Sequence, residues 1–215
     1  MLKKLLPLFL LIFLCTEGHA AFKVENLSSP KKIGSVSLEE TLNKRRSERS
    51  FASQEISKDQ ISELLWAAQG ITETTWGFRT APSAGSCYPI EIYLAKKDGV
   101  FHYLPQSNTL EQLKKEDCRP SLVRASLGQN FIGEAPAVFV FAISFDRSVE
   151  KFGRRAERYV DMEVGHAAQN LLLEATALGL VACPVGSFWD GALGRSLGLP
   201  PDQESRYLIP VGYLR

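Results

Sequence analysis

The sequence lacks a strong net charge of either sign. Its 215 residues carry 25 Lys and Arg against 24 Asp and Glu, which gives a formal net charge of +1 at pH 7. Proteins that bind nucleic acid usually carry a basic excess or a basic stripe, whereas the densest basic run here is confined to residues 44–49. We therefore expect no nucleic-acid partner.

Histidine and cysteine are also scarce, with three and four residues respectively. Cys87, Cys118 and Cys183 do not have the close spacing of the ligands in structural zinc sites, so we expect no metal site. In an oxidising compartment one disulfide and one free thiol can coexist. The sequence leaves the pairing of Cys87, Cys118 and Cys183 open.

Several common enzyme motifs are missing. The chain has no G-x-S-x-G elbow, no Walker loop and no G-x-G-x-x-G. These motifs are typical of hydrolases, nucleoside triphosphatases and dinucleotide-binding proteins, respectively. His166 lies in an apolar helical pattern and is predicted to be a packed core residue, while His102 is predicted to lie on a strand face. Neither is a good base for a Ser-His or Cys-His pair, and we assign no catalytic acid or base.

The N-terminus carries the one apolar run that lies beside a basic pair. Lysines at residues 3–4 precede ten apolar residues, 5–14, and the small residues Gly18 and Ala20 suit a cut after Ala20. This pattern is typical of a secretory signal peptide, and the run is too short for a membrane span. We expect an exported protein, periplasmic or secreted, that has no membrane contact after cleavage; a retained anchor is the alternative.

Beyond this predicted signal peptide (residues 1–20), we expect an extended arm over residues 21–36 and one domain over residues 37–215. The hydrophobic pattern mixes helices and strands without strict alternation, so the fold class is predicted as α+β. We expect helices from Ser37, from the Ser57 capping box to Gly70, over 120–128 and over 154–178. Asn108 and Asp190 are each predicted to cap a further helix. We expect strands over 90–95, 100–104, 137–145, 180–185 and 207–214.

Residues 44–51, KRRSERSF, concentrate three arginines in eight positions. Arg45 and Arg49 are four residues apart, so they reach the same side if the preceding helix continues. One interpretation is a solvated basic face at a helix end. The other is a preformed anion site, in which guanidinium groups bind phosphate oxygens and Ser47 donates its hydroxyl.

Two loops have the small residues that a close-fitting ligand requires. Residues 82–89, PSAGSCYP, are fixed by two prolines and are small between them. Residues 183–188, CPVGSF, follow a predicted strand, where backbone N–H groups can face a ligand. Each loop can equally be an ordinary connection.

Taken in order, the segments RRSERSF, SAGSCYPIEIYLA, APAVFVFA, ERYVDMEVGHAAQNLLLEATALGL, CPVGSF and IPVGYL resemble the FMN-dependent nitroreductase superfamily. The resemblance is strongest to its SagB-type dehydrogenase branch and spans residues 38–214. It implies a nitroreductase-like α+β fold, with a central mixed or antiparallel sheet flanked by helices. It also implies a homodimer with FMN at the interface, and an oxidoreductase that transfers hydride through flavin N5 to or from a small molecule.

The resemblance further implies which residues bind FMN. Arg45, Arg46, Ser47 and Arg49 would hold its phosphate, its ribityl chain and the pyrimidine edge of the flavin. Pro82, Ser83, Ala84, Gly85 and Ser86 would contact the flavin of the other subunit. Pro184, Val185, Gly186 and Ser187 would lie along the isoalloxazine ring, with the Gly186 N–H near N5. Gln129 would touch the pyrimidine edge, and Arg215 is the basic residue available after the last strand.

The substrate and the electron partner stay open. Azoline-oxidising relatives have a Lys-Tyr pair before the long helix, and the segment here, Lys151-Phe152, keeps only the lysine, which argues against azole formation. An exported protein meets little NADH or NADPH, so we hypothesise that oxygen, a quinone or an oxidisable substrate completes the cycle. The alternatives are an exported FMN-binding protein without turnover, for flavin delivery or storage, and an interaction domain without flavin.

Overall fold

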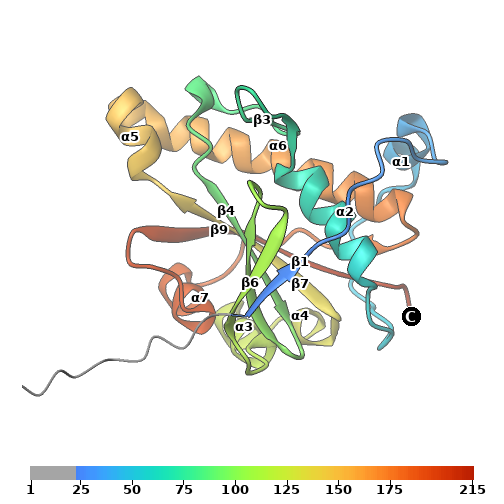
Figure 1. The fold of residues 1–215 in the computed structure, drawn as a ribbon. Helices are drawn as coiled ribbons and strands as arrows, with labels where there is room; N and C mark the ends of the chain where they lie inside the picture. The colour runs from blue at the N-terminus through green and yellow to red at the C-terminus, as the bar shows by residue number, and fades with distance from the viewer. Residues whose placement is uncertain (1–22) are drawn as a thin grey trace, which may run out of the picture.

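The structure is a computed structural model that describes residues 23–215. The predicted signal peptide therefore lies outside the described residues. A seven-stranded sheet in the order β1-β6-β5-β4-β7-β9-β8 forms the centre of the domain (Figure 1). The strands, in that order, are Lys23–Asn26, Thr109–Lys114, Gly99–Leu104, Ile90–Lys96, Ala137–Ser144, Gln203–Gly212 and Val181–Ala182. Every neighbouring pair is antiparallel, which confirms the α+β prediction.

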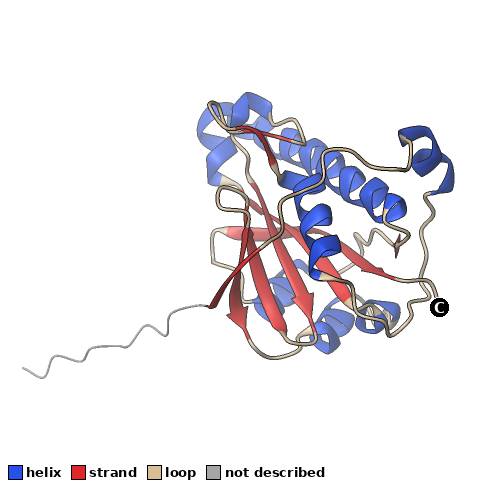
Figure 2. Cartoon of the chain, turned by 45° about the vertical axis from the view of Figure 1, so that its right-hand side comes forward, coloured by secondary structure: helices blue, strands red, loops and turns tan. Residues whose placement is uncertain are grey.

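Helices cover both faces of this sheet (Figure 2). One face packs against α2 (Lys58–Gln69) and α6 (Ala156–Ala177), and the other against α3 (Arg119–Ala125) and α7 (Asp190–Leu197). The remaining elements are α1 (Leu38–Lys44), α4 (Phe131–Glu134), α5 (Asp146–Phe152), the 3-10 turns η1 (Ala84–Ser86) and η2 (Gly153–Arg155), and the small hairpin of β2 (Ile71–Glu73) and β3 (Phe78–Arg79).

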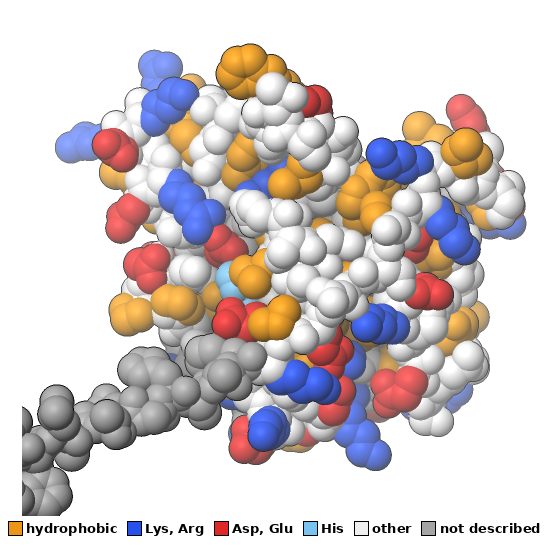
Figure 3. All heavy atoms as spheres, viewed as in Figure 1, with side chains coloured by type: hydrophobic (Ala, Val, Ile, Leu, Met, Phe, Trp, Pro, Cys, Tyr) orange, Lys and Arg blue, Asp and Glu red, His pale blue; other side chains and the backbone are white. Residues whose placement is uncertain are grey.

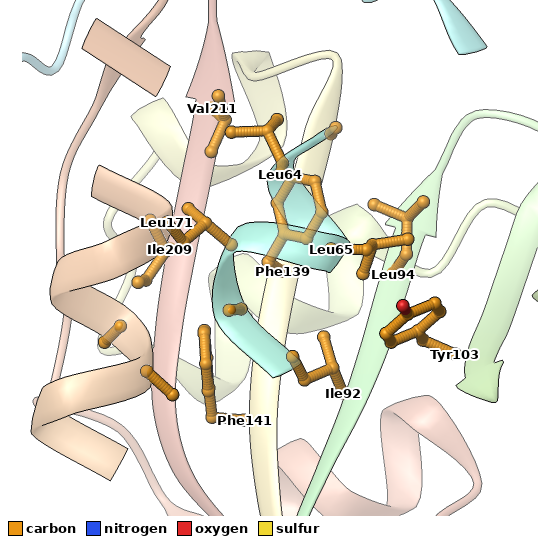
Figure 4. Packing of buried hydrophobic residues seen from close by; sticks show 14 of the residues in the cluster. Leu64, Leu65, Ile92, Leu94, Tyr103, Phe139, Phe141, Leu171, Ile209 and Val211 are labelled. Atoms are coloured by element: carbon orange, nitrogen blue, oxygen red, sulfur yellow. The ribbon is translucent and has the colours of Figure 1, made fainter. Parts of the chain in front are cut away.

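Strand β7 is buried along its whole length, as the apolar run 137–145 predicts. Successive side chains of a strand point to opposite faces, so Phe139 and Phe141 enter the cluster beneath α2 and α6, while Val138 and Val140 enter the cluster beneath α3 and α7. Figure 4 shows Phe139 and Phe141 among the leucines of α2 and α6. Each fully buried phenylalanine stabilises the fold by roughly 1.5–3 kcal/mol.

The two long helices begin and end close to their predicted positions. Ser57 and Gln60 form the predicted capping box of α2, which ends before Gly70. Helix α6 buries the stripe that contains Val160, Val164, Ala167 and Leu171, and its opposite side is exposed.

His166 lies on that opposite side of α6 and is exposed, so the prediction of a packed core histidine is wrong. Positions 166 and 164 differ by two residues, about 200° around the helix. His102 does lie on a strand, where its Nε2 atom is 2.7 Å from a carboxylate oxygen of Glu91.

Three local predictions are corrected by the structure. Asn108 begins no helix: it adopts φ 50° in the turn between β5 and β6, and its side chain donates to Ser28 O at 3.0 Å. Asp190 is the first residue of α7, and Trp189 occupies the cap position. Residues 23–26 of the predicted arm pair with β6 as an edge strand.

The three cysteines of the described residues are free thiols, so none of them forms the disulfide that was left open. Burial raises the pKa of Cys118 to about 11. Burial also raises the pKa of Cys183, and the Arg49 guanidinium opposes that rise. Within residues 23–215, no helix is long and apolar enough to cross a membrane.

Candidate functional site

The arginine segment, residues 45–51, is an extended strip rather than the end of a helix. Helix α1 ends at Lys44, and Arg45 has the extended ψ of 123°. Ser47 forms a parallel bridge with Ala182, and the Glu48 N–H donates to Ala182 O at 3.0 Å. The helix does not continue past Lys44, so Arg45 and Arg49 do not share a helix face; residues 47 and 48 pair with Ala182 of β8 instead.

This pairing places the arginine segment directly beside residues 183–188, which we call the glycine turn. The glycine turn first continues along β9: the Val185 N–H donates to Leu208 O at 2.8 Å, and the Leu208 N–H donates back at 3.1 Å. The ladder then stops. No residue within 23–215 accepts a hydrogen bond from the N–H groups of Gly186 and Ser187, so both donors remain available to a ligand.

Gly186 opens onto a pocket of about 230 Å³. A Cβ atom at this position would meet only the Tyr207 ring, at 4.0 Å, so the backbone can be approached closely there. The pocket is also lined by residues of α6 and β9: Asp161, Val164, Gly165, Arg206 and Tyr207.

The arginines carry positive charge that few neighbouring groups offset. Arg46 and Arg49 are exposed and Arg45 is half-buried, and none of the three forms an ion pair with a carboxylate within the described residues. The Arg46 guanidinium donates only to the backbone oxygens of residues 43 and 45. The Arg49 guanidinium lies 5.7 Å from the centre of the Phe131 ring.

Gln129 and Arg215 both reach this region. The Gln129 side chain donates to Ser187 O at 3.1 Å, which ties it to the glycine turn. Arg215 donates to Phe51 O at 3.2 Å and pairs with Glu134 at 2.8 Å. The structure thus brings Arg45, Arg46, Ser47, Arg49, Gln129, Pro184, Val185, Gly186, Ser187 and Arg215 to one side of the domain, although Arg215 is already engaged by a carboxylate.

Residues 82–88 of the other predicted loop, 82–89, lie elsewhere. They contact the first half of α6 and the end of α5, whereas α1, which leads into the arginine segment, lies at the far end of α6 (Figure 1). The glycine turn meets α6 at Asp161 and Gly165, while this loop meets α6 at Glu163. Glu163 is two residues from Asp161 and from Gly165, which is about 200° around the helix, so the loop and the glycine turn contact different sides of α6. Within one chain, the arginine segment is therefore not joined by Pro82, Ser83, Ala84, Gly85 and Ser86.

The backbone of this loop is strained and firmly held. Gly85, Ser86 and Tyr88 have positive φ of 59°, 56° and 46°, which is uncommon for side chains larger than glycine. The Tyr88 N–H donates to the Ser83 hydroxyl at 2.8 Å, and Lys151 donates to Gly85 O at 3.0 Å. Strain of this kind persists where the surroundings over-determine the conformation, and it is frequent at functional sites.

Four charged residues that sequence reasoning missed surround the loop: Arg79, Glu91, Arg147 and Glu163. The Arg79 guanidinium lies 4.6 Å from the Tyr88 ring centre, and Arg147 donates to Tyr88 O at 3.0 Å. Burial alone would raise the pKa of Glu91, but His102 and Arg147 hold that pKa below its ordinary value.

Comparison with known proteins gives a consistent result. Residues 42–213 match the family model described as the Nitroreductase family. The nitroreductase-family protein MJ1384 of Methanocaldococcus jannaschii is 39% identical over 186 residues, which cover 84% of this chain and 92% of that protein.

A crystal structure of a nitroreductase-family protein from Ralstonia eutropha superposes with a TM-score of 0.82 at 31% identity, over 89% of this chain and 90% of that one. The microcin B17-processing protein McbC of Escherichia coli is 29% identical over 133 residues. This match covers 56% of this chain and about half of McbC, 48%, and it is the more distant relation.

Proposed function

This chain belongs to the nitroreductase family and is an oxidoreductase of that family, and we propose that it binds FMN and acts through that cofactor. When bound, FMN supplies a ring that accepts and returns hydride at N5. The residues of this chain would hold, orient and shield that group.

The observation that carries the proposal is the pairing of the arginine segment with the glycine turn. It places three guanidinium groups without carboxylate partners beside two backbone N–H groups without acceptors, among the described residues. FMN is a molecule with a phosphate at one end and hydrogen-bonding ring nitrogens at the other. The donors therefore fit both of its ends, since arginine forks suit phosphate and N–H groups suit ring nitrogens.

Each group then has a defined task. Arg45, Arg46 and Arg49 would bind the phosphate and ribityl side, with the Ser47 hydroxyl as a further donor. The Gly186 N–H would donate toward N5, and the absent side chain at this position lets the ring approach the backbone. Gln129, which already holds the glycine turn through Ser187 O, would keep that turn in place.

A homodimer is the second part of the proposal. It is supported by the separation of residues 82–86 from the arginine segment, because a second subunit could bring that loop to the first subunit's flavin. Exposed apolar side chains on the arm and on α1 also favour a partner: Ile33 is 89% exposed, Leu38 59% and Leu42 53%. Figure 3 shows hydrophobic side chains exposed at the upper right, where Figure 1 places α1.

Export and the electron partner form the third part. The proposed signal peptide would place the mature protein where nicotinamide nucleotides are scarce, so we expect oxygen, a quinone or an oxidisable small molecule to exchange electrons with the flavin. The processing of microcin B17 is an activity of McbC, and we do not transfer it to this chain. In this chain the residue after Lys151 is Phe152, whose ring packs against Tyr159 at a centroid distance of 5.1 Å, and we propose no azole-forming activity.

An anaerobic reduction experiment tests the function and the donor together. The FMN-loaded protein is mixed with NADH, NADPH or a reduced quinone, and flavin absorbance is followed over time. We expect slow bleaching by both nicotinamides and faster bleaching by another donor. Fast bleaching by either nicotinamide would overturn the donor hypothesis, and a bound flavin that no donor reduces would point to a carrier without turnover.

A further inference from the structure

Glu163 of α6 is buried beside the loop 82–88 without a full set of hydrogen bonds. Its side chain is only 3% exposed, yet its Oε1 atom has no hydrogen-bond partner within residues 23–215. Buried carboxyl groups are rarely left in this state. Glu163 lies on the apolar stripe of α6 between Val160 and Ala167, where apolar side chains are usual. A carboxyl group at this position therefore calls for a specific explanation.

The groups that face Glu163 belong to the loop and to β3. The Ser83 hydroxyl, the Arg79 guanidinium and the Ala84 N–H all act to lower its pKa, but burial outweighs them and raises that pKa to about 7. Ser83 is well placed for this contact, because its oxygen already accepts the Tyr88 N–H and its own proton remains free to donate.

The second observation is the conformation of the loop itself. Positive φ at Ser86 and Tyr88 means that the backbone holds a shape which it would relax without outside support. Lys151 and Arg147 support one side by donating to the carbonyl oxygens of Gly85 and Tyr88. On the other side, the Ser83 hydroxyl and the Ala84 N–H are the donors of the loop that lie near Glu163.

We propose that Glu163 is the positioning residue of this loop: its carboxylate draws the Ser83 hydroxyl and the Ala84 N–H toward α6 and so holds residues 82–86 in the shape that receives FMN from the partner subunit. The inference rests on the proposed function and adds to it a residue that touches neither the cofactor nor the substrate. Because the carboxylate is the active form, FMN affinity rises with pH as Glu163 loses its proton, and then levels off.

Stability must change with pH in the opposite sense. The folded-state pKa of Glu163 lies above the value of 4.5 expected in the unfolded chain, so the unfolded state releases this proton first as the pH rises. The contribution of Glu163 to stability therefore falls from about pH 4.5 to about pH 7 and is constant above that. Replacing a residue with a purely structural role would lower the stability of the protein and its affinity for FMN together. Replacing Glu163 should lower the affinity for FMN without lowering the stability.

The test compares the purified wild-type protein with Glu163→Gln, which keeps the volume and removes the charge. FMN affinity is measured by flavin fluorescence from pH 6 to pH 8.5, and thermal stability is measured on the cofactor-free protein. Glu163→Asp serves as a rescue variant that keeps the charge. The matched control is Glu174→Gln, eleven residues along the same helix, because burial also raises the pKa of Glu174 but its charged neighbour is Glu63.

At pH 8 we expect Glu163→Gln to bind FMN about ten-fold more weakly, roughly the loss of one hydrogen bond to a charged acceptor. Its melting temperature should be equal to or above that of the wild type, and Glu163→Asp should recover part of the affinity. Its FMN affinity should rise less from pH 6 to pH 8.5 than that of the wild type, because only the phosphate of FMN, with a second pKa of about 6, then ionises. Glu174→Gln should keep wild-type affinity. Equal affinity of wild type and Glu163→Gln at every pH would overturn the inference while leaving the proposed function intact.

If the wild type binds no FMN at any pH, the proposed function fails and amide hydrogen exchange of the cofactor-free protein decides on Glu163. Faster exchange of residues 82–88 in Glu163→Gln than in wild type at pH 8 supports the positioning role. Unchanged exchange in this loop overturns it.

Discussion

The arginine segment gives the sharpest prediction, and Arg49 is the residue through which to test it. Its side chain is exposed, forms no ion pair within residues 23–215, and stacks at 5.7 Å from the Phe131 ring centre. Replacing it with alanine removes only this cation–π contact from the fold, which is worth about 0.5–1 kcal/mol at an exposed site. Arg49→Ala should therefore fold normally, with a melting temperature close to that of wild type.

The effect on FMN binding should be much larger than the effect on stability. A hydrogen bond to a charged group contributes about 1.5–3 kcal/mol, and each 1.4 kcal/mol is a factor of about ten in the dissociation constant. We expect Arg49→Ala to raise the FMN dissociation constant by about 10- to 100-fold. The difference between the two proteins should shrink at high salt, because ions screen exposed charges.

Fluorescence titration of the cofactor-free protein with FMN measures this effect. The control is Arg124→Ala, an exposed arginine on α3 that donates to the Ser121 hydroxyl at 2.7 Å. Arg124→Ala should keep wild-type affinity. The same affinity in both variants, or a loss in Arg49→Ala that follows a lower melting temperature, would refute the assignment of Arg49 to an anion site.

Three further predictions concern the loop, the core and acid stability. Gly85→Ala should lose about 1–2 kcal/mol of stability and weaken FMN binding, since φ is 59° and the new Cβ would meet Lys151 Nζ at 2.6 Å; urea unfolding and FMN titration would measure this. Phe139→Ala should lose about 3–5 kcal/mol in urea unfolding because it empties a fully buried site. The pKa of Glu91 is held low, so its stabilising contribution is present above about pH 4.5 and lost as the pH falls through its folded-state pKa; Glu91→Gln should flatten acid unfolding over that range.

The fold was predictable where local pattern and tertiary environment agree. The run 137–145 is apolar on both faces and rich in Val, Ile and Phe, which is typical of a central strand, and β7 is buried on both faces. The capping box at Ser57 works through contacts within four residues, so sequence alone suffices to locate it. The prediction that Asn108 caps a helix is wrong for the opposite reason. Its left-handed conformation depends on the pairing between β5 and β6, and a local cap signal contains no information about that pairing.

The sequence singles out the arginine segment and the glycine turn as candidates, but it does not show how they come together. Arg45 and Arg49 belong to an extended strip because Ser47 pairs with Ala182, a contact between residues far apart in the sequence. Glu163 could have been found, since helical spacing places it on the stripe of Val160 and Ala167. The link between Glu163 and the loop 82–88 could not be predicted, because the loop reaches Glu163 only through the packing of η1 on α6.

The central claim is that the paired arginine segment and glycine turn hold FMN. The most direct measurement is the visible spectrum of the purified protein, followed by release and identification of any chromophore. The account predicts flavin bands at roughly 370 and 450 nm, as for an oxidised flavin cofactor, and about one FMN per chain. A colourless protein that takes up no added FMN would contradict the account and reduce the arginine segment to a solvated basic strip.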